Sequence, residues 1–99
     1  AKEAIELFCY QTKKWIGSFT TVLGGLDTLV FSGGIGEHSP EVRSKICDSL
    51  GFLGIELYEI KNMNNEAIIS IEESKVTVRV ITTNEEVMIA RLVNDMLNK

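Results

Sequence analysis

A short apolar segment that runs directly into a glycine-rich turn constrains the fold of this chain more than any other feature. Leu29-Val30-Phe31 predicts a central, parallel strand that is covered on both faces. Three of the next five residues are glycines, and Ser39-Pro40 then suits the N-cap and first position of a helix. A strand that passes into a helix through such a turn is typical of α/β domains. Ligands bind there beyond the carboxyl ends of the strands.

Three segments repeat apolar residues every three or four positions, as amphipathic helices do. They cover residues 2–24, residues 40–50 and a stretch after Thr83. Gly24-Gly25 would end the first helix, because glycine adopts the left-handed cap conformation at little steric cost. Thr83 and Glu86 form a capping box for the third helix. Its apolar positions are Ile89, Leu92, Val93, Met96 and Leu97.

Further strands are expected within residues 52–58, at residues 68–71 and over residues 76–80. In the last of these, three valines alternate with polar residues, which predicts a strand with one buried face. Residues 62–66 have the composition of a turn. The order helix, strand, helix, strand, strand, helix is that of an α/β fold, and one domain extends over residues 1–99.

The composition is that of a folded, acidic domain. A length of 99 residues, with 44% hydrophobic and 24% charged residues, suffices for one core and excludes a disordered chain. The net charge of -4 argues against a nucleic-acid partner, because phosphate backbones bind clustered Lys and Arg. No membrane span or signal segment is visible, so we expect no membrane partner and a cytoplasmic location. Cys9 and Cys47 are expected to be buried free thiols, and Ala1, which lies within a helical pattern, suggests a piece of a longer chain.

The glycine-rich turn is the first candidate site. Without side chains, its backbone can approach a flat or anionic ligand closely, but a tight turn that needs glycine only for packing has the same composition. The spacing is neither that of a dinucleotide-binding loop nor that of a phosphate-binding loop. His38 could donate a proton or contact a base, or it could be an ordinary surface residue.

The second candidate is the acidic segment that follows Thr83. The capping box accounts for Glu86, whereas Glu85 has no such assignment. A metal role for Glu85 competes with that of an exposed first-turn glutamate, because a single carboxylate is a poor magnesium site. Phe8, Trp15 and Phe19 are interpreted as core residues and not as a stacking surface.

Several motifs, in order and over nearly the whole chain, resemble the acetate kinase family, a branch of the acetate and sugar kinase, heat-shock protein and actin superfamily. They are Ile16-Gly17-Ser18-Phe19, Gly24-Gly25-Leu26-Asp27, Phe31-Ser32-Gly33-Gly34-Ile35-Gly36-Glu37-His38-Ser39, Glu41-Val42-Arg43, Leu53-Gly54-Ile55, Thr83-Asn84-Glu85-Glu86 and Ile89-Ala90-Arg91. The resemblance implies the ribonuclease H-like α/β fold of the actin-like ATPase superfamily. Residues 1–99 would be a partial carboxy-terminal domain, the nucleotide-binding part of the second domain, with the amino-terminal domain absent.

The resemblance also implies an activity and its residues. The parent enzyme would be an ATP-dependent phosphotransferase and a homodimer, which converts acetate and ATP to acetyl phosphate and ADP. The part outside this chain would bind acetate or a related short carboxylate and would supply the catalytic residues, so the chain alone would be inactive. Glu85 would help to hold Mg²⁺. The contacts to ATP or ADP would come from Gly33, Gly34, Ile35, Gly36, Glu37 and His38.

Three residues depart from the pattern of the family. His38 replaces the usual Asn, Ser32 the usual Thr, and Thr82 stands where Pro is common. Serine keeps the hydroxyl and Thr82 only loosens the backbone, whereas His38 changes the expected geometry of the nucleotide pocket. The alternatives are a butyrate or propionate kinase, or a module that binds or dimerises without catalysis.

Overall fold

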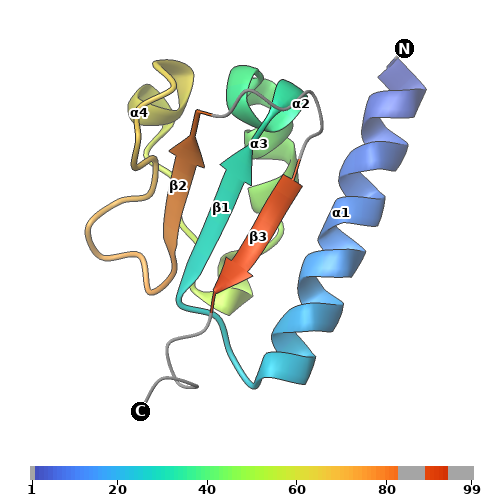
Figure 1. Cartoon of the computed structure of the whole chain (residues 1–99), viewed down its shortest axis with the longest axis vertical. Helices are drawn as coiled ribbons and strands as arrows, with labels where there is room; N and C mark the ends of the chain where they lie inside the picture. Colours follow the sequence, from blue (N-terminus) through green and yellow to red (C-terminus); the bar gives the residue numbers. More distant parts are fainter. Residues whose placement is uncertain (1, 83–88, 94–99) are drawn as a thin grey trace.

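A computed structural model describes residues 2–82 and 89–93, which form a small α/β unit (Figure 1). In this view α3 lies behind the sheet and α1 lies beside β3. The elements are α1 Lys2–Leu23, β1 Thr28–Ser32, α2 Gly34–His38, α3 Pro40–Cys47, the 3₁₀ turn η1 Gly51–Leu53, α4 Glu59–Met63, β2 Thr77–Ile81 and β3 Ile89–Val93. The predicted α/β class is confirmed, since helices and strands alternate and share one core.

The sheet has three strands in the order β2-β1-β3. The central position predicted for β1 is confirmed, and Leu29 and Phe31 are completely buried. β1 runs parallel to β2 but antiparallel to β3, so the prediction of a parallel strand holds for one neighbour only. In the parallel pair Ser32 lies opposite Ile81. The carboxyl ends of β1 and β2 therefore meet at the same edge of the sheet.

The long first helix ends where the sequence predicts. Gly24 and Gly25 have φ angles of 78° and 149°, a region that favours glycine, and their amides donate to carbonyls of the last turn of α1. The expectation that Trp15 and Phe19 are core residues is wrong. Their rings lie 5.0 Å apart on a face of α1 that leaves them 40% and 44% exposed. The buried face of α1 is carried instead by Cys9, Ile16 and Thr20.

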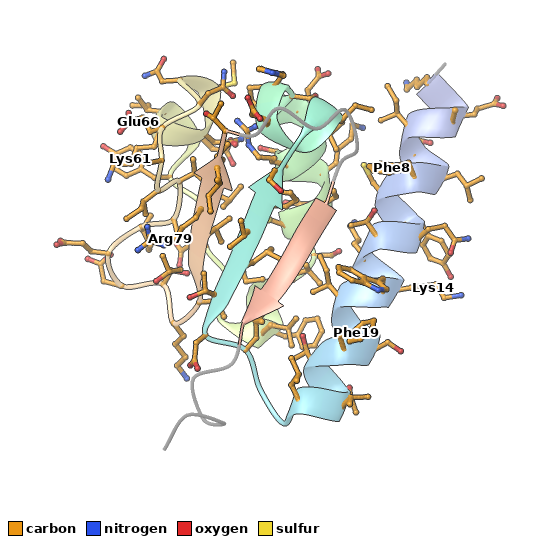
Figure 2. The ribbon with its side chains drawn as sticks, viewed as in Figure 1. Phe8, Lys14, Phe19, Lys61, Glu66 and Arg79 are labelled. Atoms are coloured by element: carbon orange, nitrogen blue, oxygen red, sulfur yellow. The ribbon has the colours of Figure 1, made fainter. Side chains whose placement is uncertain are left out.

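The exposed face of α1 mixes polar residues with apolar ones such as Leu7 and Val22. Lys14 points away from the sheet (Figure 2), and its Nζ lies 5.7 Å from the centre of the Tyr10 ring.

The core lies between the sheet and the helices. Its residues are Cys9, Ile16, Leu29, Phe31, Val42, Ile46, Cys47, Leu50, Ile55, Ile69, Val76, Val78 and Val80. Both cysteines are free and buried, which confirms the prediction, and burial raises the pKa of the Cys47 thiol from 9.0 to about 12.

Residues 52–58 do not form the expected strand. Gly51 opens a 3₁₀ turn and Gly54, with φ 93°, closes it, so that the chain bends where an extended strand would have to run. Only Leu57 makes a strand-like bridge, to Ser70. Residues 62–66 begin as the end of α4 and then turn at Asn64 and Asn65.

The prediction of an edge strand at residues 68–71 is confirmed in part, because these residues pair with neighbouring segments but form no regular strand. Ile68 forms an isolated bridge to Arg79, and the amide of Ile69 donates to the carbonyl of Val78 over 2.9 Å. The strand predicted over residues 76–80 is confirmed as β2. Its Val78 and Val80 face the core while Arg79 is exposed, the alternation expected of a strand with one buried face.

The last predicted helix is wrong over the part that the structure describes. Residues 89–93 form β3, which pairs with the free edge of β1. A five-residue segment with apolar residues on both sides of Arg91 fits either periodicity, and as β3 it gives the backbone of the central strand its second set of hydrogen-bond partners. The capping box of Thr83 and Glu86, Glu85 between them, and Met96 and Leu97 lie outside the described residues.

Candidate functional site

The glycine-rich turn lies at the carboxyl end of β1 and forms the single helical turn α2 (Figure 1). Gly33 has φ 73° and ψ 149°, and Gly34 has φ 37°. Side chains with a Cβ rarely adopt either conformation, so the sharp exit from β1 requires glycine. The amide of Glu37 donates to the carbonyl of Gly33 over 3.1 Å, and that of Ser39 donates to Ile35 over 2.9 Å. The turn is therefore a hydrogen-bonded helix and not an open loop.

The helix start predicted after this turn is confirmed. The Oγ of Ser39 accepts from the amide of Val42 over 3.4 Å, and Pro40 occupies the first helical position. Ser39 is extended, with φ -117° and ψ 95°, as the residue before a proline prefers. One residue thus separates α2 from α3 and fixes the direction in which the chain leaves the site.

A cavity of about 210 Å³ opens beside α2. Two segments at the carboxyl edge of the sheet line it, α2 and the end of β2, together with the turn after α4. The lining residues are Glu37, His38, Asn65, Ala67, Val80 and Thr82. Complete ligand pockets are usually larger than about 300 Å³, so this hollow has room for one part of a larger ligand.

The predicted contact residues divide into three kinds in the structure. Glu37 and His38 line the cavity directly. Gly33 and Gly36 are buried, and Gly34 is half-buried. Ile35 is 47% exposed, so its apolar side chain is open to a flat ligand.

Glu37 and His38 carry the charge of the site. The side chain of Glu37 is 10% exposed and that of His38 is 74% exposed, and Oε2 of the first lies 3.3 Å from Nε2 of the second. A protonated His38 would form an ion pair with Glu37, and a neutral one can donate a hydrogen bond to it. The imidazole is thus held close to the cavity while one side of it stays open to solvent.

Arg43 is the residue that the sequence interpretation missed. It is completely buried in α3 and donates five hydrogen bonds to described residues. Nη1 binds the carbonyls of Gly36 and Glu37 over 3.0 and 3.1 Å. Nε and Nη2 bind Oδ1 and the carbonyl of Asn62, each over 2.8 Å, and Nη2 binds Oδ1 of Asn65 over 2.6 Å. Burial lowers the pKa of this guanidinium, which nevertheless stays charged at neutral pH.

A signal for this burial was present in the sequence. Position 43 lies three, four and seven residues before Ile46, Cys47 and Leu50, all of which are buried, so it falls on the inner face of the helix. Asn62 completes the arrangement, since its Nδ2 donates to the carbonyl of Pro40 over 2.9 Å and to Oγ of Ser44 over 3.0 Å. A sequence pattern does not reveal partners that are 19 and 22 positions away.

The expected metal ligand, Glu85, lies outside the described residues, so its role stays a prediction. Within residues 2–82 and 89–93, no group of three or more His, Cys, Asp or Glu side chains could hold a metal ion. In the same part of the chain, no helix combines the length and apolar character needed to cross a bilayer.

Comparison with known proteins places an α/β chain of this kind among the kinases of small organic acids. The model of the Acetokinase family matches residues 1–91, and the chain belongs to that family. The acetate kinase of Coprothermobacter proteolyticus is 53% identical over 92 residues, which are 92% of this chain and 23% of the relative. The acetate kinase of Carboxydothermus hydrogenoformans is 50% identical over 93 residues, with the same two shares.

Solved structures agree with this assignment. The crystal structure of Porphyromonas gingivalis acetate kinase matches with a TM-score of 0.78 and 39% identity, over 86% of this chain and 22% of that one. A propionate kinase from Francisella tularensis matches with a TM-score of 0.76 and 40% identity, over the same shares. The chain thus spans about a quarter of the length of the relatives it matches. The family match covers residues 1–91, nearly the whole of this chain, and does not bear out the expected carboxy-terminal position.

Proposed function

We propose that this chain is the nucleotide-binding part of an acetate kinase, which transfers a phosphoryl group between ATP and acetate. The observation that carries the proposal is the position of α2, at the carboxyl end of β1 and beside a cavity that its own Glu37 and His38 line. Ligands of open α/β sheets bind at this edge. Membership of the Acetokinase family, and relatives named acetate kinase, supply the activity and the nucleotide.

In this proposal the half-buried Gly34 presents bare backbone to the nucleotide, so that a flat ring can approach the main chain without meeting a Cβ, and the buried Gly33 and Gly36 shape the turn that places it there. Ile35 offers an exposed apolar side chain to the same ligand, and Glu37 and His38 offer polar groups at the cavity. These residue types fit a base or a sugar better than a phosphate chain, because the described cavity lining contains no Lys or Arg. The volume of about 210 Å³ suits such a partial contact.

The remaining chemistry belongs to residues outside the site described above. Phosphoryl transfer needs cations that neutralise charge on the transferred group, and ATP is used with Mg²⁺, for which Glu85 is our proposed ligand. Arg43 contacts the turn, but it cannot serve as such a cation. Its side chain is completely buried, and it donates its hydrogen bonds to five neutral protein oxygens. The groups that clamp acetate and the phosphoryl would therefore lie elsewhere in a longer protein, and the chain alone would be inactive.

The architecture and the partners complete the proposal. The described unit would be part of a ribonuclease H-like domain of the actin-like ATPase superfamily, within a cytoplasmic, two-domain enzyme that forms a homodimer. Free, buried cysteines are in keeping with a reducing compartment. The apolar side chains that α1 leaves exposed, among them Trp15 and Phe19, would be covered by other parts of that enzyme.

A second candidate is a propionate kinase, which the structure from Francisella tularensis supports at 40% identity. The full-length protein should be assayed for acyl hydroxamate formation with acetate, propionate and butyrate at equal concentrations, with ATP and Mg²⁺. Acetate is expected to give the highest kcat/KM. A preference for propionate would move the assignment to the second candidate, and no ATP-dependent product with any of the three acids would refute both.

A further inference from the structure

Arg43 joins two segments that are far apart in sequence and that both contribute residues to the lining of the candidate cavity. One is the end of α2, whose carbonyls at Gly36 and Glu37 accept from Nη1. The other is the end of α4, where Asn62 and Asn65 accept from Nε and Nη2. Glu37 and Asn65 are also lining residues of the cavity of about 210 Å³. One buried side chain therefore sets the distance between the two walls.

The local sequence explains why α2 needs such a donor. Pro40 favours an extended conformation at Ser39, and the helix stops after one turn. The carbonyls of the last turn of a helix have no partners within that helix. Arg43 donates to both carbonyls from a single nitrogen on the inner side of α3.

The chemistry of the contact sets it apart from ordinary core packing. All five accepting oxygens are neutral, so the buried charge is balanced only by the number and geometry of the hydrogen bonds. A fork of five N–H groups can meet this set, whereas the ammonium group of lysine has three donors on one atom. An apolar residue could fill the space but would remove the hydrogen bonds that Arg43 donates to the carbonyls of Gly36 and Glu37.

We propose that Arg43 is a positioning residue for the nucleotide, which acts by holding the backbone of α2 at a fixed distance from the turn after α4. This inference rests on the proposed function, because it names what sets the geometry of the same site. Arg43 would not touch the ligand, since its side chain is completely buried and all its donors are directed to protein oxygens. Its loss should therefore weaken nucleotide binding without removing any contact to the nucleotide.

The test compares Arg43→Met and Arg43→Lys with Ile46→Ala in the full-length protein. Ile46 lies on the same helix, is completely buried and packs in the core, so its truncation provides a matched loss of stability away from α2. Assays are run at a temperature at which all variants are folded by circular dichroism. Arg43→Met is expected to raise the KM for ATP about tenfold, Arg43→Lys by less, and both should leave the KM for acetate within about twofold. Ile46→Ala should leave both KM values within about twofold of the wild type.

Hydrogen exchange provides a readout that needs no nucleotide. The amides of Glu37 and Ser39, which donate within α2, should exchange at least about tenfold faster in Arg43→Met than in Ile46→Ala. Equal KM values for ATP in Arg43→Met and Ile46→Ala would overturn the proposal, as would equal exchange at these two amides. If the wild-type protein binds no ATP, the proposed function fails, and the exchange comparison alone then decides whether Arg43 holds α2. Should Arg43→Met not fold, Arg43→Lys serves for both readouts.

Discussion

Replacing Gly36 by alanine separates a role in binding from a role in folding. Gly36 lies inside α2 and does not share the positive φ of Gly33 and Gly34, so an alanine can adopt its backbone conformation. Helix propensity alone would then favour alanine by about 1 kcal/mol. Because Gly36 is buried, its new methyl group must displace α2, and if α2 lies against the nucleotide the displaced turn pushes on the ligand. Overpacking by one methyl group typically costs ~1–3 kcal/mol, which corresponds to a loss of ATP affinity of roughly five- to 150-fold.

Gly34→Ala should behave differently. Its φ of 37° strains a residue that carries a Cβ, so we expect a loss of about 1 kcal/mol in the free energy of unfolding in addition to weaker ATP binding. Gly17→Ala in α1 is the control, because a Cβ there meets no atom within 4 Å and the helical position favours alanine. This variant should keep its ATP affinity.

The assay pairs isothermal titration of ATP with urea denaturation, both on the full-length protein. The expected pattern is a loss of ATP affinity in Gly36→Ala that exceeds its loss of stability, losses of both kinds in Gly34→Ala, and neither loss in Gly17→Ala. Unchanged ATP affinity in Gly36→Ala and Gly34→Ala, with reduced stability in both, would refute the reasoning. The glycines would then be needed for the backbone conformation of the turn and not for binding the nucleotide.

Three further predictions concern stability, protonation and metal use. Gly54→Ala should lower the free energy of unfolding by more than about 2 kcal/mol in urea denaturation, because its φ is 93° and the new Cβ would lie 2.7 Å from Cβ of Lys75; a loss below about 0.5 kcal/mol would contradict this. Since burial raises the pKa of Cys47 from 9.0 to about 12, the folded protein holds this proton more tightly than the unfolded chain, and stability should fall as pH rises from about 9 towards 12. Cys47→Ala should flatten that fall when denaturation is compared at pH 8 and pH 10, and an equally steep fall would count against the argument. In the full-length protein Glu85→Ala should raise the Mg²⁺ concentration needed for half-maximal activity, whereas Glu86→Ala should mainly lower the melting temperature; identical responses would show that the two acids share one role.

The parts of the fold that could be predicted from the sequence are those that depend on neighbouring residues. The glycines that end α1 and the Ser39-Pro40 start of α3 act over one to three positions, and both are where the sequence indicates. The buried run that became β1 was recognised because only a central strand is covered on both faces. Short periodicities and helix caps are therefore sufficient to predict an element whose conformation depends on neighbouring residues.

The errors concern elements whose conformation is decided by distant partners. The apolar residues within 89–93 follow a pattern that suits a helix or a strand, and only the free edge of β1, about 60 residues earlier, makes the strand favourable. The faces of α1 were misjudged for the same reason, since Trp15 and Phe19 are as apolar as Ile16 but only Ile16 meets the core. The partners of Arg43 in α4 were equally out of reach of a sequence pattern.

Pro40 connects the local and the distant parts of this site. It begins α3 and, by favouring an extended Ser39, it ends α2, which leaves the carbonyls of Gly36 and Glu37 without helical partners. Arg43 lies one turn into the helix that Pro40 starts, on its inner face, where it reaches those same carbonyls. The residue that ends α2 therefore also starts the helix that carries Arg43, the donor to these carbonyls. Arg43 thus holds the backbone of α2 from the inner side of α3, and the described cavity beside the same turn lies at the carboxyl edge of the sheet, where ligands of open α/β sheets bind.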